Sequence, residues 1–394
     1  MDGETPRKAP VGGRKISRRA EGVPPFIVMD VIRDANAMEA RGESVVHCEV
    51  GQPSTPAPSG ALRAAATALE KDKIGYVEAL GMPVLRERIA ALYGEWYGVA
   101  LDPARVIVTT GSSAGFLMAF LAAFDAGDAV AMAAPGYPPY RNILSSLGMR
   151  PLDIVTSEAE RYQPTVAALS KVAEPLAGLI VASPSNPTGT MVTRGELAAL
   201  ATHCRAAGTR LISDEIYHGL TYGGRATSAL EVTDDAIVVN SFSKYFSMTG
   251  WRIGWLVVPP DLVRPIERLT QNLMISTPTL SQFAALGAFD CRDELEAHVA
   301  RYRANRDLLL ERLPAAGFDR LTVPEGAFYL YADVSRLTND SVEFCRRMLR
   351  EAGVAATPGV DFDPDRGRGT LRFSFAGSTA DMAEAARRLA AWKR

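Results

Sequence analysis

The sequence has few of the residues that build metal centres or disulfide frameworks. It contains four cysteines and four histidines in 394 residues, with no CxxC pair and no HExxH pair. Scattered cysteines of this kind are typical of reduced, mostly buried thiols in a cytoplasmic protein. We therefore predict no disulfide and no metal site. The four cysteines are Cys48, Cys204, Cys291 and Cys345.

Long apolar runs and a strong net charge are also missing. The run GFLMAFLAAF (115–124) stops at Asp125, whereas a membrane-spanning helix needs about 20 apolar residues. The net charge is −2, which provides no field to attract nucleic acid or an anionic membrane. We expect neither of them as a partner.

The first twenty residues are an exception to this balance. Basic residues stand there among glycine and proline, and residues 1–20 are therefore expected to be a solvated, disordered arm. No sustained apolar region follows the charges, which argues against a secretory signal. The basic residues are Arg7, Lys8, Arg14, Lys15, Arg18 and Arg19.

Between about residues 57 and 290, short β-branched runs alternate with helical patterns. The runs are apolar on both faces, which is typical of a mostly parallel sheet covered by helices on both sides. They are RVIVTTG (105–111), AVAMAAP (129–135), GLIVASP (178–184), RLISDEIY (210–217), AIVVNSF (236–242) and RIGWLVV (252–258). We expect a large α/β domain over 57–290.

The two ends of the chain have a different pattern. A strand-like run, VVHCEV (45–50), precedes the large domain. A long amphipathic stretch (293–313), two alternating strand patterns (327–334 and 370–375) and a helix opened by Ser378 follow it. We expect a smaller α+β domain made of residues 21–56 and 291–394.

Several predicted strands end at polar side chains. Ligands of open parallel sheets bind beyond the carboxyl ends of the strands, so these groups are expected to meet in one crevice. The runs supply an amide, a carboxylate with a nearby phenol, two hydroxyls with a lysine, and a serine turn at a helix start. The residues are Asn186, Asp214, Tyr217, Ser241, Ser243, Lys244, Ser112 and Ser113.

This set of groups matches the needs of pyridoxal phosphate. The cofactor requires an amine for a Schiff base, a carboxylate at its ring nitrogen, donors to its phenolic oxygen and an anion site for its phosphate. Lys244 would be the amine, made nucleophilic by a nearby cation in a partly dry pocket. Asp214 would keep the ring nitrogen protonated, and Asn186 and Tyr217 would donate to the phenolic oxygen.

The phosphate is expected to lie between a guanidinium and a helix start. Arg252 offers two parallel donors to a phosphate. The hydroxyls of Ser241 and Ser243 and the backbone N–H groups of Ser112 and Ser113 would complete the cup.

Three motifs together resemble the class I/II aminotransferases, which are fold-type I pyridoxal-phosphate enzymes. They are ASPSNPTGT, SDEIY and SFSKYFSMTGWRIGW, and they occur in the family's order. The resemblance spans roughly residues 25 to 394. It implies the same roles for Lys244, Asp214, Asn186 and Tyr217, and for the phosphate residues Ser112, Ser113, Ser241 and Arg252.

The resemblance implies four further roles. PGYPPY (135–140) would place Tyr137 on the cofactor face, and LRFSFA (371–376) would supply Arg372 to the substrate α-carboxylate. EVGQPSTPAP (49–58) would bring Gly51 to that carboxylate, so Gly51, Asn186 and Arg372 are the expected substrate contacts. Tyr76 would reach the phosphate of a partner subunit, which implies a homodimer with a shared active site.

The resemblance also implies the reaction. It predicts transfer of an amino group from an L-amino acid to a 2-oxo acid, with ping-pong kinetics through a Schiff base at Lys244. Some aspartate-active members have Gly-Gly-Lys-Gln in the phosphate turn, where this chain has Gly-Ser-Ser-Ala (111–114). The missing lysine argues against aspartate and leaves neutral or aromatic amino acids open.

Two alternatives remain open from the residues. Another fold-type I enzyme, such as a C–S β-lyase, would start from the same Schiff base. GSSAG (111–115) also matches the G-x-S-x-G elbow of serine hydrolases, with Ser113 as nucleophile, Asp214 as the acid and His218 or His298 as the base. That alternative leaves Lys244 without a role.

Overall fold

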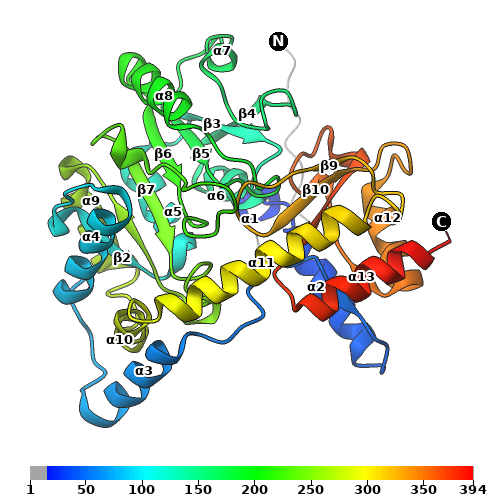
Figure 1. Ribbon diagram of the computed structural model, residues 1–394. Coiled ribbons are helices and arrows are strands. Elements are labelled where there is room, and N and C mark those ends of the chain that lie inside the picture. Colours follow the sequence, from blue (N-terminus) through cyan, green and yellow to red (C-terminus); the bar gives the residue numbers. More distant parts are fainter. Residues whose placement is uncertain (1–15, 394) are drawn as a thin grey trace, which may run out of the picture.

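The computed structural model describes residues 16–393, which contain one large sheet and smaller sheets beside it (Figure 1). The large sheet has the order β2-β8-β7-β6-β5-β3-β4. Its strands from β7 to β4 run parallel, and β8 is antiparallel to both of its neighbours. The strands are β2 (Val106–Thr109), β3 (Ala129–Ala134), β4 (Arg150–Val155), β5 (Gly178–Ala182), β6 (Arg210–Asp214), β7 (Ile237–Ser241) and β8 (Gly254–Val257).

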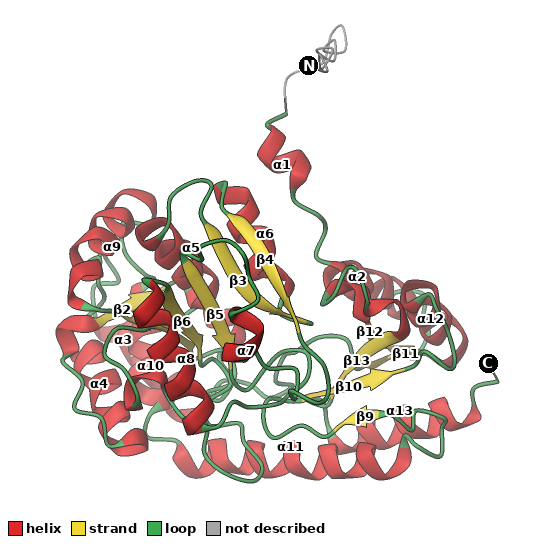
Figure 2. Cartoon of the chain, turned by 90° about the horizontal axis from the view of Figure 1, so that it is seen from above, coloured by secondary structure: helices red, strands yellow, loops and turns green. Residues whose placement is uncertain are grey.

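Helices cover both faces of this sheet (Figure 2). Neighbouring strand residues such as Leu211 and Ile212 belong to two different apolar clusters, because successive side chains point to opposite faces. One face is covered by α5 (Gly111–Ala123), α6 (Pro138–Leu147) and α9 (Pro260–Leu273), and the other by α4 (Pro83–Tyr97), α8 (Arg194–Ala207) and α10 (Thr279–Ala288). Helix α3 (Ser59–Lys71) packs on α10, and α7 (Val166–Leu169) lies beside α8.

A smaller α+β unit contains both ends of the described chain. Its antiparallel sheet has the order β12-β13-β10-β9. Strand β1 (Val46–His47) pairs in parallel with β11 (Val354–Ala355), so the two chain ends meet there. The other elements are β9 (Leu321–Thr322), β10 (Tyr329–Asp333), β12 (Thr357–Pro358), β13 (Thr370–Ser374), α2 (Ile27–Glu39), α12 (Ser341–Arg347) and α13 (Thr379–Ala391). The predicted fold class is confirmed.

Helix α11 (Arg292–Arg312) extends from the large unit to the small one (Figure 1). The proposed boundaries at residues 56/57 and 290/291 stay predictions. Of the expected basic arm, residues 1–15 lie outside the described part of the chain, and Arg18–Gly22 form a short helix, α1.

Local signals explain several helix starts. Thr193 and Glu196 form a reciprocal capping box at α8, and the side chain of Ser378 accepts a hydrogen bond from the Asp381 backbone at α13. All four cysteines are free and buried, as expected. Within residues 16–393, no helix combines the length and apolarity needed to cross a bilayer.

Candidate active site

A cavity of about 210 Å³ lies between the carboxyl ends of the large-sheet strands and the small unit. It receives side chains from the β2–α5 turn, from the segments that follow β5, β6 and β7, and from α2, β10 and β13. Ten of the predicted site residues line it: Gly51, Ser112, Ser113, Tyr137, Asn186, Tyr217, Ser243, Lys244, Arg252 and Arg372.

Lys244 stands three residues beyond β7 and reaches into this cavity. Its Nζ donates a hydrogen bond to the backbone carbonyl oxygen of Gly51, at 2.6 Å. Burial, together with the charges of Arg372 and Arg252, lowers the pKa of Lys244 from 10.5 to about 8, although the Asp214 charge acts in the opposite direction. Roughly a tenth of the amine is then unprotonated at pH 7, and only this unprotonated form is nucleophilic.

Asp214 ends β6 and lies behind the cavity wall, with 3% of its surface exposed. Its Oδ1 accepts a hydrogen bond from the Ile216 backbone at 3.1 Å, and its Oδ2 accepts one from the Tyr140 hydroxyl. Burial raises the pKa of Asp214 to about 6, although these two bonds and the Lys244 charge act in the opposite direction. A buried carboxylate of this kind gains most from a cationic partner.

Arg372 of β13 is 2% exposed and bridges the two units. Its Nη1 donates to Oδ1 of Asn186 at 2.8 Å, and its Nη2 donates to the backbone oxygen of Glu49 and to the Thr357 hydroxyl. Its Nε has no partner among the described residues. Because Asn186 accepts through its oxygen, its amide N–H groups remain available to a ligand.

The predicted phosphate residues gather at the start of α5. No side chain caps this helix, so its first N–H groups are open to an anion. Ser112, Ser113 and Ser243 line the cavity there with Arg252. Ser241 does not line the cavity. Its hydroxyl donates a hydrogen bond to the Ser243 hydroxyl at 2.8 Å, so Ser241 contacts the cavity only through Ser243.

Gly51 cannot carry a side chain at this place. A Cβ at residue 51 would lie 1.7 Å from the Tyr329 hydroxyl oxygen. That hydroxyl also hydrogen-bonds to Tyr217 at 2.7 Å. The close approach of the Gly51 backbone leaves its carbonyl free to hold Lys244.

Tyr76 is the one predicted residue that lies apart from these groups. It is 82% exposed and lines a separate surface hollow with Ser276–Leu280. It makes no contact with the cavity of its own chain.

Sequence reasoning missed two tyrosines. Tyr140 follows Tyr137 by one helical turn of α6, a spacing that places two side chains on one face and could have indicated it. Tyr329 packs under the Arg372 guanidinium, 4.2 Å from ring to Cζ, and no spacing signal predicts this contact. The apolar wall supplied by Phe26, Val28 and Met29 was also missed.

The serine-hydrolase arrangement does not form. His218 donates from Nε2 to the Ser183 carbonyl at 2.9 Å and accepts at Nδ1 from the Tyr97 hydroxyl at 2.6 Å. His298 contacts Ser247. Neither histidine has a hydrogen bond to Ser113 within residues 16–393.

Comparison with known proteins agrees with this geometry. The family model described as aminotransferase class I and II matches residues 44–389. The chain belongs to this family.

Individual relatives match this chain over nearly its whole length. A valine–pyruvate aminotransferase of Mycobacterium tuberculosis is 50% identical, over 96% of this chain and 98% of its own length. An aminotransferase structure from the same organism has a TM-score of 0.94 at 50% identity, covering 96% and 99% of the two chains. The aspartate aminotransferase of Thermus thermophilus with maleate has a TM-score of 0.90 at 32% identity, covering 96% and 100%.

The enzyme is thus a pyridoxal-phosphate-dependent aminotransferase, and the lyase and hydrolase alternatives are not favoured. Its residues fit the cofactor. A partly neutral lysine, an uncapped helix start beside Arg252 and a buried carboxylate that lacks a cation are the complements of an aldehyde, a phosphate and a protonated ring nitrogen.

Proposed function

We propose that this aminotransferase acts on L-amino acids with small apolar side chains, such as valine, and passes the amino group to a 2-oxo acid such as pyruvate. One observation carries the proposal. The described residues that line the cavity include three cations, Lys244, Arg252 and Arg372, and in this proposal each would bind the cofactor or the α-carboxylate. None is left for a second substrate carboxylate. The valine–pyruvate relative, at 50% identity, supports the same substrate class.

The remaining wall favours an apolar side chain. Phe26, Val28 and Met29 from the start of α2 line it, together with Val50 and Ile216. Asp361 accepts hydrogen bonds from the backbone N–H groups of Ile27 and Val28 at 3.1 and 3.2 Å, which holds that helix start in place. Each buried CH₂ of a substrate would gain about 0.8 kcal/mol against such a wall.

The residues would divide the work as follows. Pyridoxal phosphate, when bound, supplies an aldehyde that joins amines and a ring that accepts electrons. Lys244 would hold the cofactor in the resting enzyme and then move the proton at the substrate Cα. Asp214 would hold the proton on the ring nitrogen, and Arg372 would orient the substrate by its α-carboxylate.

Other groups would position the cofactor. Asn186 and Tyr217 would donate to the phenolic oxygen, and Tyr137 would cover one face of the ring. Arg252 would bind the phosphate with the hydroxyls and N–H groups of Ser112, Ser113 and Ser243, and Ser241 would act through its hydrogen bond to Ser243.

A donor panel tests the substrate class. Single-turnover consumption of the bound cofactor should be at least about a hundredfold more efficient with valine than with aspartate, as expected when a charge enters an apolar pocket. Ser113→Lys should raise the rate with aspartate, whereas Ser113→Met, of similar length, should not. Equal efficiency of aspartate and valine in the wild type would overturn the proposal.

We also propose that the enzyme is a homodimer in which Tyr76 completes the partner's site. Tyr76 is 82% exposed and lines a surface hollow together with the exposed Ile74 and with Leu280, and an exposed apolar patch can mark a protein interface. The four free, buried cysteines support a cytoplasmic location.

Mixed dimers test the shared site. Co-refolding Lys244→Ala with Tyr76→Phe should restore activity, because one of the two sites then has Lys244 and a partner's intact tyrosine. Light scattering checks that dimers have formed. If they have formed and activity does not recover, Tyr76 acts in the site of its own chain or in no site.

A further inference from the structure

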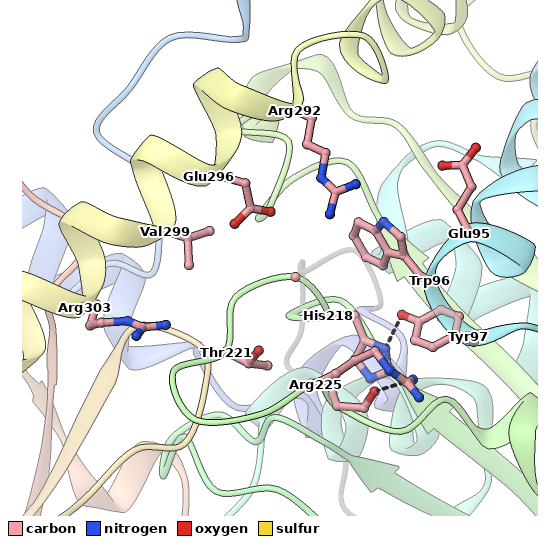
Figure 3. Close-up of a pocket in the computed structure, with 12 residues that line it drawn as sticks. Glu95, Trp96, Tyr97, His218, Thr221, Arg225, Arg292, Glu296, Val299 and Arg303 are labelled. Carbon is pink, nitrogen blue, oxygen red and sulfur yellow. Dashed lines mark hydrogen bonds between the residues drawn. The ribbon is translucent and has the colours of Figure 1, made fainter.

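A second cavity, of about 330 Å³, lies on another side of the active-site segments (Figure 3). The end of α4 supplies Glu95, Trp96 and Tyr97, and the turn after β6 supplies residues from His218 to Ala226. Helix α11 presents Arg292, Glu296, Val299 and Arg303 to it. These four positions recur at spacings of three and four and therefore share one face of the helix.

The positive side chains that line this cavity are not all paired with acidic side chains. Arg225 pairs with Glu231 at 2.6 Å, and Glu95 pairs with Arg88 at 3.0 Å, both with groups outside the lining. Arg292 and Arg303 form no ion pair within the described part of the chain. Two unpaired guanidinium groups therefore face one acid, Glu296, whose Oε1 accepts a hydrogen bond from Tyr245 at 2.8 Å.

The opposite wall carries the aromatic side chains of Trp96 and Tyr97, and its two charged residues, Glu95 and Arg225, are each paired with a residue outside the lining. Trp96 and Tyr97 are half-buried, and the Arg225 guanidinium lies 5.0 Å from the Tyr97 ring centroid. His218 adds no charge, because burial lowers its pKa to about 4. In Figure 3, Arg292 points from α11 toward Trp96, and Arg303 points from the same helix toward Thr221. The cavity thus has cations near α11 and ring surfaces facing them.

Residues in and beside the walls of this cavity are adjacent in the sequence to active-site residues. His218 follows Tyr217, and Tyr245 follows Lys244. Gly219, with φ of +89°, lies so close to Tyr245 that a Cβ would be 2.4 Å from its ring. Tyr245 also meets the Trp96 ring edge-on at 5.2 Å. A change in the Trp96 or Glu296 position would therefore act directly on the residue beside the reactive lysine.

We propose that this cavity is an effector site for a small organic anion that combines a flat ring with a carboxylate or phosphate group. The anionic group would bind the forked donors of Arg292, which points toward Trp96 and suits both kinds of anion, and Arg303 would add positive charge at the other end of the cavity. The ring would lie against Trp96 and Tyr97. Occupancy is transmitted to Lys244 through the Glu296–Tyr245 hydrogen bond.

Binding is tested on the cofactor-loaded enzyme without any amino acid, so the result does not depend on the substrate class proposed above. Adenosine 5′-monophosphate serves as the phosphate probe and benzene-1,4-dicarboxylate as the carboxylate probe, with calorimetry as the readout. At least one of them should bind the wild type, and which one binds identifies the anionic group. Adenosine has the ring but no anionic group, so its affinity should be lower than that of adenosine 5′-monophosphate by about tenfold or more.

Variants of α11 locate the site. Arg292→Gln with Arg303→Gln should weaken binding by about tenfold or more. Arg312→Gln is the matched control, because Arg312 is an exposed arginine of the same helix and lies outside this cavity. Failure of both probes to bind the wild type at millimolar concentration, or equal binding by the double variant, would overturn the proposal.

Coupling is tested separately. Tyr245→Phe removes the hydroxyl that donates to Glu296, so the bound probe should no longer alter kcat while its affinity stays within about twofold of the wild type. The same change of kcat in wild type and Tyr245→Phe would refute this route of transmission.

Discussion

The hydroxyl of Tyr140 provides a sharp test of how the buried carboxylate is tuned. It donates to Oδ2 of Asp214 and thereby lowers a pKa that burial raises from 3.8 to about 6. A hydrogen bond to a charged group contributes about 1.5–3 kcal/mol, and about 1.4 kcal/mol corresponds to one pH unit. We therefore expect Tyr140→Phe to raise the pKa of Asp214 by a further one to two pH units, roughly.

The sign of the effect on stability follows from this direction. A carboxyl whose pKa is higher in the folded protein destabilises the fold as pH rises from the unfolded pKa to the folded one. In the cofactor-free wild type that interval runs from 3.8 to about 6, and its total cost is about 3 kcal/mol. In Tyr140→Phe the interval should extend to roughly pH 7–8, with a further loss of about 1.5–3 kcal/mol.

Urea unfolding of the cofactor-free protein across this pH range measures the effect. Tyr222→Phe is the matched control, because the buried Tyr222 hydroxyl donates to an uncharged group, the backbone oxygen of Ala327. Its loss should cost about 1 kcal/mol at every pH. Parallel pH profiles for the two variants would refute the reasoning.

Activity gives a second readout of the same change. A carboxyl that keeps its own proton cannot hold the cofactor's ring nitrogen protonated. Tyr140→Phe should therefore lower kcat by about tenfold, in line with one pH unit or more of pKa change, while Tyr222→Phe should leave kcat near the wild-type value. Equal kcat values in Tyr140→Phe and Tyr222→Phe would show that the Tyr140 hydroxyl does not contribute to the reaction.

Three further predictions concern the cations of the cavity. Reductive trapping with borohydride followed by mass spectrometry should find the cofactor on Lys244, and Lys244→Ala should retain no covalent adduct; an adduct at another lysine would contradict the assignment. Arg372→Leu should raise KM for the amino donor by about a hundredfold, because truncating one partner of a buried charge pair costs about 2–5 kcal/mol, while cofactor affinity changes little; an unchanged KM would remove Arg372 from substrate binding. In the cofactor-free protein, the pH midpoint for modification of Lys244 by an amine reagent should lie near 8, and it should rise in Arg252→Gln because the Arg252 charge lowers that pKa; a midpoint that stays the same would show that Arg252 has no such effect.

The sequence predicted the large sheet and its polar strand ends because both depend on local patterns. Apolar runs that end in Asp214 and Lys244 are visible without coordinates, and parallel strands bring their ends together. The antiparallel direction of β8 was not predictable in this way, because an apolar run reads the same in either direction. Tyr329 was missed because its place beside Gly51 depends on how the segment after β1, which is distant in the sequence, packs against the small sheet.

The hydrogen bond between Arg372 and Asn186 has a consequence for how the enzyme can move. One partner belongs to the antiparallel sheet and the other follows a strand of the parallel sheet. If Arg372 and Asn186 have the roles proposed above, separation of the two units would break the contact that binds the substrate carboxylate and would also move the Asn186 amide away from the cofactor. Under these roles, binding of the substrate carboxylate and closure of the two units would be coupled, and a substrate that does not bind Arg372 would also leave the cofactor less tightly held.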